Sequence, residues 1–207
     1  MLVLRYLRTA TLAFVMAVMV IAPGAHAESA KDASVMVSSL ADRALRILGN
    51  KAVTRTKREA EFRILFKKNF HVRSIGVFVL GRHWRRATPA QRKAYLNVFE
   101  RFIVKTYTVR LSQYAGEKFK IIKSTGPDDR GVYLVDSAIK RPGKSSISLS
   151  WTIRRAKAGL RVVDIVIENL SMAQTQRDDF AGIIRTRGSI DGLIAALEEK
   201  MKKLEKS

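Results

Sequence analysis

The side chains that most often carry out catalysis are few in this chain and poorly spaced for it. Its 207 residues include no cysteine, which excludes a thiol nucleophile and a thiolate metal site. After position 27 only His71 and His83 remain, with no Cys or further His to complete a zinc ligand set. The sequence also has no G-x-S-x-G, P-loop or G-x-G-x-x-G motif. We therefore expect no enzyme activity, no metal and no cofactor.

Asp164 and Glu168 are placed to share one face of a strand, as a pair of catalytic carboxylates would. However, the chain has 39 Lys and Arg residues against 18 Asp and Glu, a formal net charge of +21. Surface ion pairs are therefore the expected role of both carboxylates. A charge this high also favours an anionic partner, which would be a nucleic acid, a phospholipid surface or an acidic protein.

The first 27 residues have the features of a secretory signal peptide. Arg5 and Arg8 precede an apolar run, and Ala25 and Ala27 supply the small residues that a signal peptidase requires. A retained anchor helix is the alternative, but the run is shorter than the about 20 apolar residues that span a bilayer. We expect cleavage after Ala27, export to the periplasm, one domain over residues 28–207, and no nucleic acid as partner.

Apolar positions three and four residues apart predict amphipathic helices at both ends of the mature chain. In the first half they fall over residues 37–48, over a segment opened by a capping box of Thr56 and Glu59, and over a short segment that ends at Gly81. Two further helices close the chain, the last of them from Ser189. None of these helices is apolar all round.

The longest predicted helix follows a basic, aromatic segment that we call the collar. The collar consists of Arg82, Trp84, Arg85 and Arg86. Thr88, Pro89 and Gln91 then form the clearest helix start in the chain, and the apolar period continues to about Tyr114. The apolar stripe of this helix is broad and rich in rings. By itself such a stripe more often indicates plain core than a ligand site.

From about residue 118 the apolar period changes from 3.6 to 2, which predicts strands. Turn signals divide this region into four strands, at about 119–124, 132–140, 145–154 and 160–168. In the last strand Val163, Ile165 and Ile167 form the inward set, and Asp164 and Glu168 point the other way. The predicted fold class is α+β, with a mainly antiparallel sheet of about four strands covered on one face by several helices.

Two blocks of the sequence carry a family resemblance. They are FVLGRHWRRATPAQRKAYLNVFERFIVKTY and VVDIVIENLSMAQTQRDDFAGIIRTRGSIDGLIAALEEK, with the patterns G-R-x-W-R-x-A-T-P and G-x-I-D-x-L-I. The chain resembles the MlaC, or toluene-tolerance, family of periplasmic phospholipid-binding proteins from about Ala33 to Lys200. It departs from the family at His71, where an acidic residue is common after the phenylalanine, so the local helix cap is expected to differ.

The resemblance implies a curved, NTF2-like sheet and a periplasmic carrier that is not an enzyme. Such a carrier holds phospholipid tails between sheet and helices and leaves the headgroup at the mouth of its cavity. It exchanges lipid with an outer-membrane lipoprotein complex and with an inner-membrane ABC transporter complex that contains MCE domains. We expect a monomer whose cargo is the lipid.

Ring-bearing and branched side chains on the long helix, the last two strands and the penultimate helix are the expected cavity lining. They are Phe99, Phe102, Ile103, Tyr107, Trp151, Ile153, Val163, Ile165, Ile167 and Phe180. The collar is expected either at the rim of the cavity or in partner docking. Ordinary core or surface remains the alternative for each of these residues.

Three other functions fit parts of the sequence. An exported basic module would bind a polyanion or a membrane surface, and a related carrier would hold another envelope lipid, such as a hopanoid. A small-molecule enzyme would need a buried acid or Tyr facing the pocket, whereas the inward positions of the sheet are apolar. Rising salt should abolish polyanion binding but leave tail binding intact.

Overall fold

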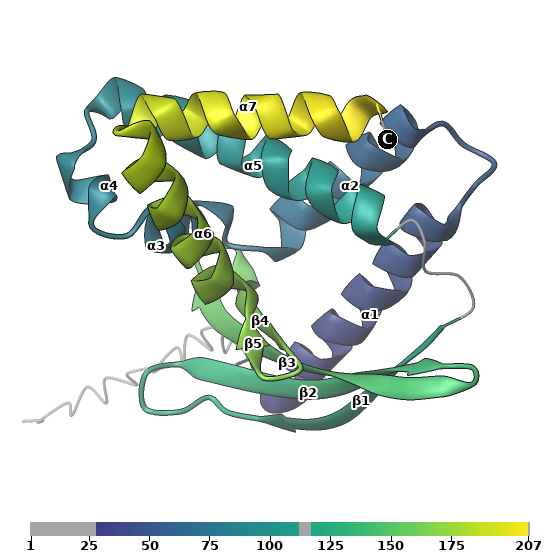
Figure 1. Cartoon of the computed structure of the whole chain (residues 1–207). Helices are drawn as coiled ribbons and strands as arrows, with labels where there is room; N and C mark the ends of the chain where they lie inside the picture. Colours follow the sequence, from purple (N-terminus) through teal and green to yellow (C-terminus); the bar gives the residue numbers. More distant parts are fainter. Residues whose placement is uncertain (1–27, 112–116, 207) are drawn as a thin grey trace, which may run out of the picture.

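The computed structural model describes residues 28–111 and 117–206. The predicted signal peptide and Tyr114 lie outside these residues. Figure 1 shows the strands on one side of the protein and a layer of helices across one face of the sheet. This arrangement confirms the predicted α+β class and the covering of the sheet by helices.

The described residues form an antiparallel sheet in the order β1-β2-β3-β4-β5. The strands are β1 (Lys118–Thr125), β2 (Val132–Arg141), β3 (Lys144–Ala156), β4 (Gly159–Ile167) and β5 (Leu170–Ser171). The four predicted strands are confirmed as a meander, and the two-residue β5 is an addition that the sequence pattern did not indicate. The β3–β4 register shifts between Thr152 and Ile153, whose partners are Asp164 and Val162, so Val163 is the extra residue of a β-bulge.

Seven helices are present in the described residues. They are α1 (Ala30–Gly49), α2 (Arg55–Asn69), α3 (Val72–Leu80), α4 (His83–Arg86), α5 (Pro89–Leu111), α6 (Met172–Arg187) and α7 (Ile190–Lys206). In Figure 1, α5 and α7 run alongside each other in the layer farthest from the sheet, while α1 descends to the sheet. Helix α6 also slopes from that layer toward the sheet.

Side-chain caps mark the start of six of the seven helices in the described residues, and three of them bear on the sequence predictions. The capping box predicted for α5 is confirmed, because Gln91 N–H donates to the Thr88 hydroxyl at 3.2 Å and Thr88 N–H donates to the Gln91 side chain at 3.1 Å. The Thr56 cap is wrong: Thr54, two residues earlier, accepts from the N–H of Lys57, and Thr56 lies inside α2. His71 caps α3, where its Nδ1 accepts from Ser74 N–H at 3.3 Å.

Two apolar clusters stabilise this arrangement. The first joins α1 and α2 to the inner face of the sheet and includes Val37, Leu65 and Ile153. The second lies among α3, α5, α6 and α7 and includes Tyr95, Phe180 and Leu197. Helix α5 contributes side chains to both clusters. Its broad apolar stripe is therefore explained by its packing on two sides.

Candidate functional site

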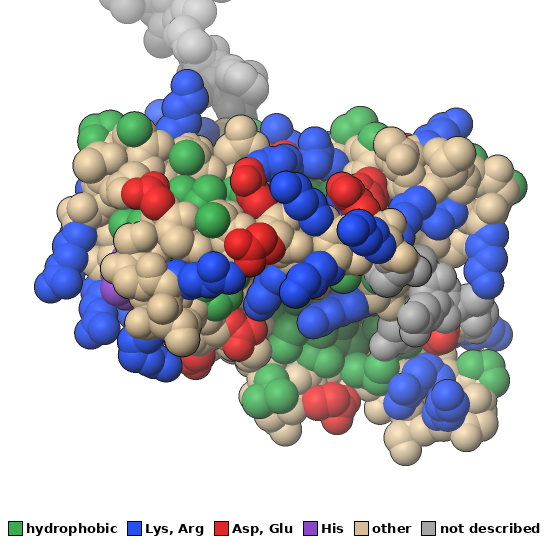
Figure 2. Space-filling model, turned by 45° about the horizontal axis from the view of Figure 1, so that its top comes forward, with side chains coloured by type: hydrophobic (Ala, Val, Ile, Leu, Met, Phe, Trp, Pro, Cys, Tyr) green, Lys and Arg blue, Asp and Glu red, His purple; other side chains and the backbone are tan. Residues whose placement is uncertain are grey.

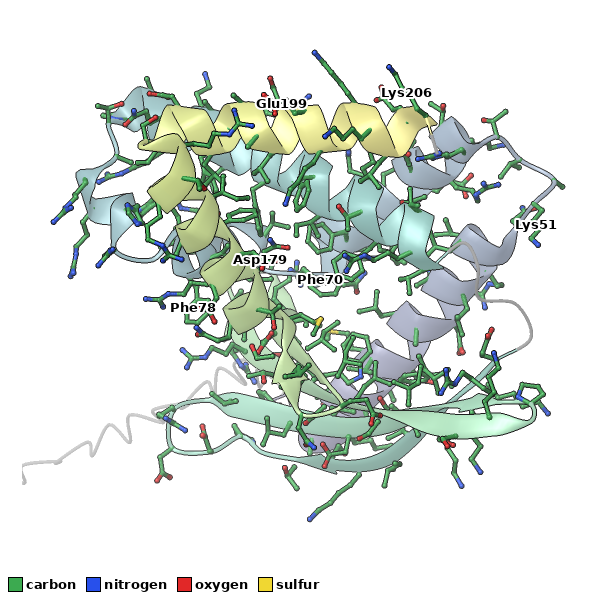
Figure 3. The ribbon with its side chains drawn as sticks, in the orientation of Figure 1. Lys51, Phe70, Phe78, Asp179, Glu199 and Lys206 are labelled. Carbon is green, nitrogen blue, oxygen red and sulfur yellow. The ribbon has the colours of Figure 1, made fainter. Side chains whose placement is uncertain are left out.

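An apolar cavity of about 240 Å³ lies between the sheet and the helices. Its helical wall is Leu40, Ala41, Ala44, Leu45, Leu48, Phe62, Phe66, Ile75, Val79, Phe99, Ile103, Tyr107, Leu111, Met172, Ala173 and Gln176. Its remaining wall is Phe70, Phe119, Ile139, Ile147, Leu149, Trp151, Val163, Asp164, Ile165 and Ile167. Figure 3 shows Phe70 in the interior between the helices and the sheet, where its ring lies 4.7 Å from that of Phe66.

The cavity opens to the surface on one side. Figure 2 looks into a recess of hydrophobic side chains between the helical layer and the sheet, with Lys and Arg side chains along the helical edge and acidic side chains among them. An amphiphilic ligand can therefore place its apolar part in the interior while its headgroup stays near water and the basic surface.

Seven of the ten residues expected at the cavity line it. They are Phe99, Ile103, Tyr107, Trp151, Val163, Ile165 and Ile167. Three of them share one edge of α5, since Phe99, Ile103 and Tyr107 are spaced by four residues. On β3, the Trp151 ring lies edge-on to Phe119 at 6.2 Å, and its Nε1 donates to the Ser137 hydroxyl at 2.9 Å. The indole therefore presents its apolar surface with its single donor already bonded.

Phe102, Ile153 and Phe180 do not line the cavity. The Phe102 and Phe180 rings lie 6.0 Å apart in the cluster between α5, α6 and α7, because Phe102 is on the other edge of the broad α5 stripe. Ile153 is fully buried beyond the β-bulge, opposite Val162, where Phe70 bridges to the sheet. These three side chains belong to the packed core.

None of the collar residues lines the cavity. The Trp84 ring is flanked by the guanidinium groups of Arg73 and Arg92, at 5.5 and 5.2 Å from its centroid. Arg82, Arg85 and Arg86 are exposed around this stack. Burial, together with the charges of Arg82 and Arg86, lowers the pKa of His83.

Three polar side chains interrupt the cavity lining: Tyr107, Asp164 and Gln176. Asp164 was expected to point away from the inward set, but the bulge at Val163 and the bonds to the start of α6 bring its carboxylate into the wall. One oxygen accepts from Ile165 N–H at 2.8 Å and from Ala173 N–H at 3.0 Å. The other accepts from the Ser171 hydroxyl at 2.5 Å. This carboxylate therefore stabilises the N-terminus of α6.

The expected surface ion pairs of Asp164 and Glu168 do not form among the described residues. Glu168, in the turn after β4, accepts from Ser148 N–H at 2.5 Å. Near Asp164, burial raises the pKa of Tyr107, the Arg110 charge partly offsets that shift, and the Asp164 charge adds to it. Neither the Tyr107 hydroxyl nor the Gln176 amide forms a hydrogen bond with another described residue.

Sequence reasoning missed most of the helical wall. Leu40, Ala44 and Leu48 of α1 and Phe62 and Phe66 of α2 all line the cavity. The signal was present, because these are the apolar positions that predicted the two helices. Periodicity shows that such a face is buried, but it does not show whether protein atoms or a cavity lie against it.

Metal-binding groups of side chains and membrane-spanning helices are both absent from residues 28–111 and 117–206. No group of three or more His, Cys, Asp or Glu side chains is placed to hold a metal ion there. Within the same residues, no helix has the length and apolar character needed to cross a membrane.

The fold and the cavity together define a class of protein: an α+β domain whose helices and curved sheet enclose an apolar space. The chain belongs to the MlaC family, because residues 38–199 match the MlaC protein family. The resemblance seen in the sequence is therefore confirmed. The match covers the first motif-bearing block and all of the second block except its last residue, Lys200.

The fold is also similar to that of a solved structure, a phospholipid-binding protein from Ralstonia solanacearum in complex with a phospholipid. The TM-score is 0.72 with 22% sequence identity, and the match covers 84% of this chain and 98% of that one. At this identity the similarity concerns the fold, and it supports the α+β assignment along nearly the full length of the relative.

Proposed function

We propose that this protein is a periplasmic lipid carrier that holds phospholipid tails in its apolar cavity and moves the lipid between outer-membrane and inner-membrane complexes. The observation that carries the proposal is the cavity itself, which is apolar on both walls and open on one side. The MlaC family is a family of periplasmic lipid carriers and not of enzymes. The similar Ralstonia protein was solved with a phospholipid bound.

The cost of exposing lipid tails to water determines how such a carrier must work. Each CH₂ group costs about 0.8 kcal/mol to transfer into water, so two long tails cost on the order of 20 kcal/mol. Release into free solution is therefore very slow. Cargo must pass by direct contact to a partner that already offers an apolar path, which is the role we propose for an outer-membrane lipoprotein complex and an inner-membrane MCE-domain transporter.

The collar fits docking better than headgroup binding. None of its residues lines the cavity, and its arginines are exposed around the Trp84 ring, which Arg73 and Arg92 contact. We infer that it contacts an acidic surface of one of these partner complexes. The carrier acts as a monomer after removal of residues 1–27, a segment outside the described residues.

The test measures lipid on the protein purified from a Gram-negative envelope, by native mass spectrometry followed by lipid extraction. Wild-type protein should carry phospholipid. Ile165→Glu places a charge in the cavity wall and should remove most of that lipid, because an unpaired charge is strongly unfavourable in an apolar site.

Leu134→Glu is the matched control, since Leu134 lies on β2 of the same sheet but is 44% exposed and outside the cavity. It should load like wild type. Circular dichroism and melting curves establish that both variants fold. Wild-type protein that carries no lipid and takes none from vesicles would refute the carrier proposal, as would equal loading of both variants.

A further inference from the structure

One part of the cavity wall is chemically distinct. Tyr107 on α5, Asp164 on β4 and Gln176 on α6 are the polar side chains in its wall, and we call them the polar end. Gln176 follows Ala173 by three residues on α6, and the Ala173 N–H binds Asp164, so these side chains share one region. Tyr107 lies close enough for the Asp164 charge to influence its hydroxyl.

The sign of the charge at the polar end is opposite to that of the protein. The chain has 39 Lys and Arg residues against 18 Asp and Glu, yet the charged side chain in the cavity lining is the carboxylate of Asp164. Charges act more strongly in an apolar cavity than in water. A carboxylate or phosphate group brought to this end would therefore be repelled, whereas a hydroxyl or ammonium group would be attracted.

The hydrogen-bonding capacity of the polar end points in the same direction. Asp164 accepts three hydrogen bonds and so occupies the N-terminus of α6, where an anion would otherwise bind. The Tyr107 hydroxyl and the Gln176 amide have no partner among the described residues, although both line the cavity. An incoming hydroxyl can donate to and accept from these groups, which a bare acyl chain cannot do.

We propose that the polar end selects lipids whose buried polar group is a neutral or cationic hydrogen-bond donor, and that it rejects lipids with a buried acid. This inference rests on the proposed carrier function and specifies its cargo chemistry. A glyceryl ester fulfils the requirement through its hydroxyl groups. A free fatty acid with the same chain does not, because its carboxylate would face that of Asp164.

The experiment compares 1-palmitoylglycerol with palmitate, two probes that share one acyl chain. Each displaces a neutral fluorophore, N-phenyl-1-naphthylamine, from delipidated full-length mature protein at pH 8. Wild-type protein should prefer the glyceryl ester by about tenfold, the range expected for hydrogen bonds to charged and polar groups in a buried site. Asp164→Asn removes the charge and should reduce this preference to about twofold.

Two further variants keep the result interpretable. Tyr107→Phe removes the hydroxyl and preserves the ring, so it should weaken binding of the glyceryl ester and leave palmitate binding unchanged. Ile147→Val trims an apolar position of the wall on β3 and should change both affinities alike.

The outcomes separate the two proposals. A wild-type preference that neither Asp164→Asn nor Tyr107→Phe reduces would overturn the selectivity role of the polar end, as would equal affinities for both probes in wild-type protein. Failure of both probes to displace the fluorophore would instead contradict the carrier function itself.

Discussion

Phenylalanines on α5 have two different roles, one in the cavity wall and one in the packed core. One edge of the helix faces the cavity through Phe99, Ile103 and Tyr107, and the other faces α6 and α7 through Val98 and Phe102. The mean directions of the two edges differ by about a third of a turn. Phe102, three residues after the cavity residue Phe99, therefore belongs to the core. The sequence predicts that both edges of α5 are buried. It does not predict what each edge packs against, because those neighbours come from elements far away in the chain.

Tyr95 allows a pH test of this helical core. Its hydroxyl donates to the Gly76 carbonyl at 3.0 Å, and burial raises the pKa of Tyr95 far above its ordinary value. Above about pH 10 the unfolded chain loses the phenol proton and the folded chain keeps it. The unfolded state then binds fewer protons, so the free energy of unfolding falls as pH rises.

Tyr95→Phe should therefore lose about 1 kcal/mol at pH 7 and show a shallower decline in stability between about pH 9 and 11. Urea unfolding followed at several pH values measures both effects. The same decline in wild type and variant would mean that Tyr95 ionises normally in the fold.

Packing between whole elements depends on one small residue in α3. A Cβ at Gly76 would lie 2.8 Å from Leu96 Cδ2 and 3.2 Å from Phe99 Cδ1, so the glycine permits the close approach of α3 to α5. Phe99 and Val79 both line the cavity, and the spacing of these two helices therefore shapes its wall.

Gly76→Ala should destabilise the protein by about 1–3 kcal/mol through overpacking. Gly182→Ala on α6 is the matched control, because its Cβ would meet only the end of Arg185 at 3.7 Å. That substitution should be neutral or stabilise by up to about 1 kcal/mol, as alanine favours helix. Urea midpoints measure both. Equal midpoint shifts would show that helix propensity decides the effect and the α3–α5 contact does not.

The elements were largely predictable and the details of their contacts were not. Local signals were sufficient to predict α5 and β3: the capping box of Thr88 and Gln91 for the helix, and the alternation of apolar and polar residues around Trp151 for the strand. The bulge at Val163 depends on pairing with β3 and on the bonds of Asp164 to α6, which a pattern within one strand does not contain. For the same reason the strand pattern placed Asp164 on the wrong side.

The whole molecule is strongly basic, and its charge is locally balanced in some places and unbalanced in others. Along α5 and α7, Arg101 pairs with Glu198 at 3.0 Å, and Lys105 pairs with Glu205. Between Phe70 and Phe99, by contrast, the sequence contains no acidic residue. The collar lies inside this unbalanced stretch, so an acidic partner would be steered to it over a distance set by ionic strength.

Docking through the collar predicts that transfer and retention of cargo respond differently to charge. Replacing Arg82, Arg85 and Arg86 with Gln should leave bound lipid unchanged and slow transfer to the membrane acceptor complex by about tenfold at low salt. Salt should slow wild-type transfer and leave lipid retention unaffected, because tails are held by apolar contacts. Stopped-flow transfer of a fluorescent phospholipid measures the rates.

Replacing Lys118, Lys120 and Lys123 of β1 with Gln removes the same charge elsewhere and is the control. Equal slowing by both triple variants would assign the effect to net charge, and no slowing by the collar variant would exclude the collar from docking.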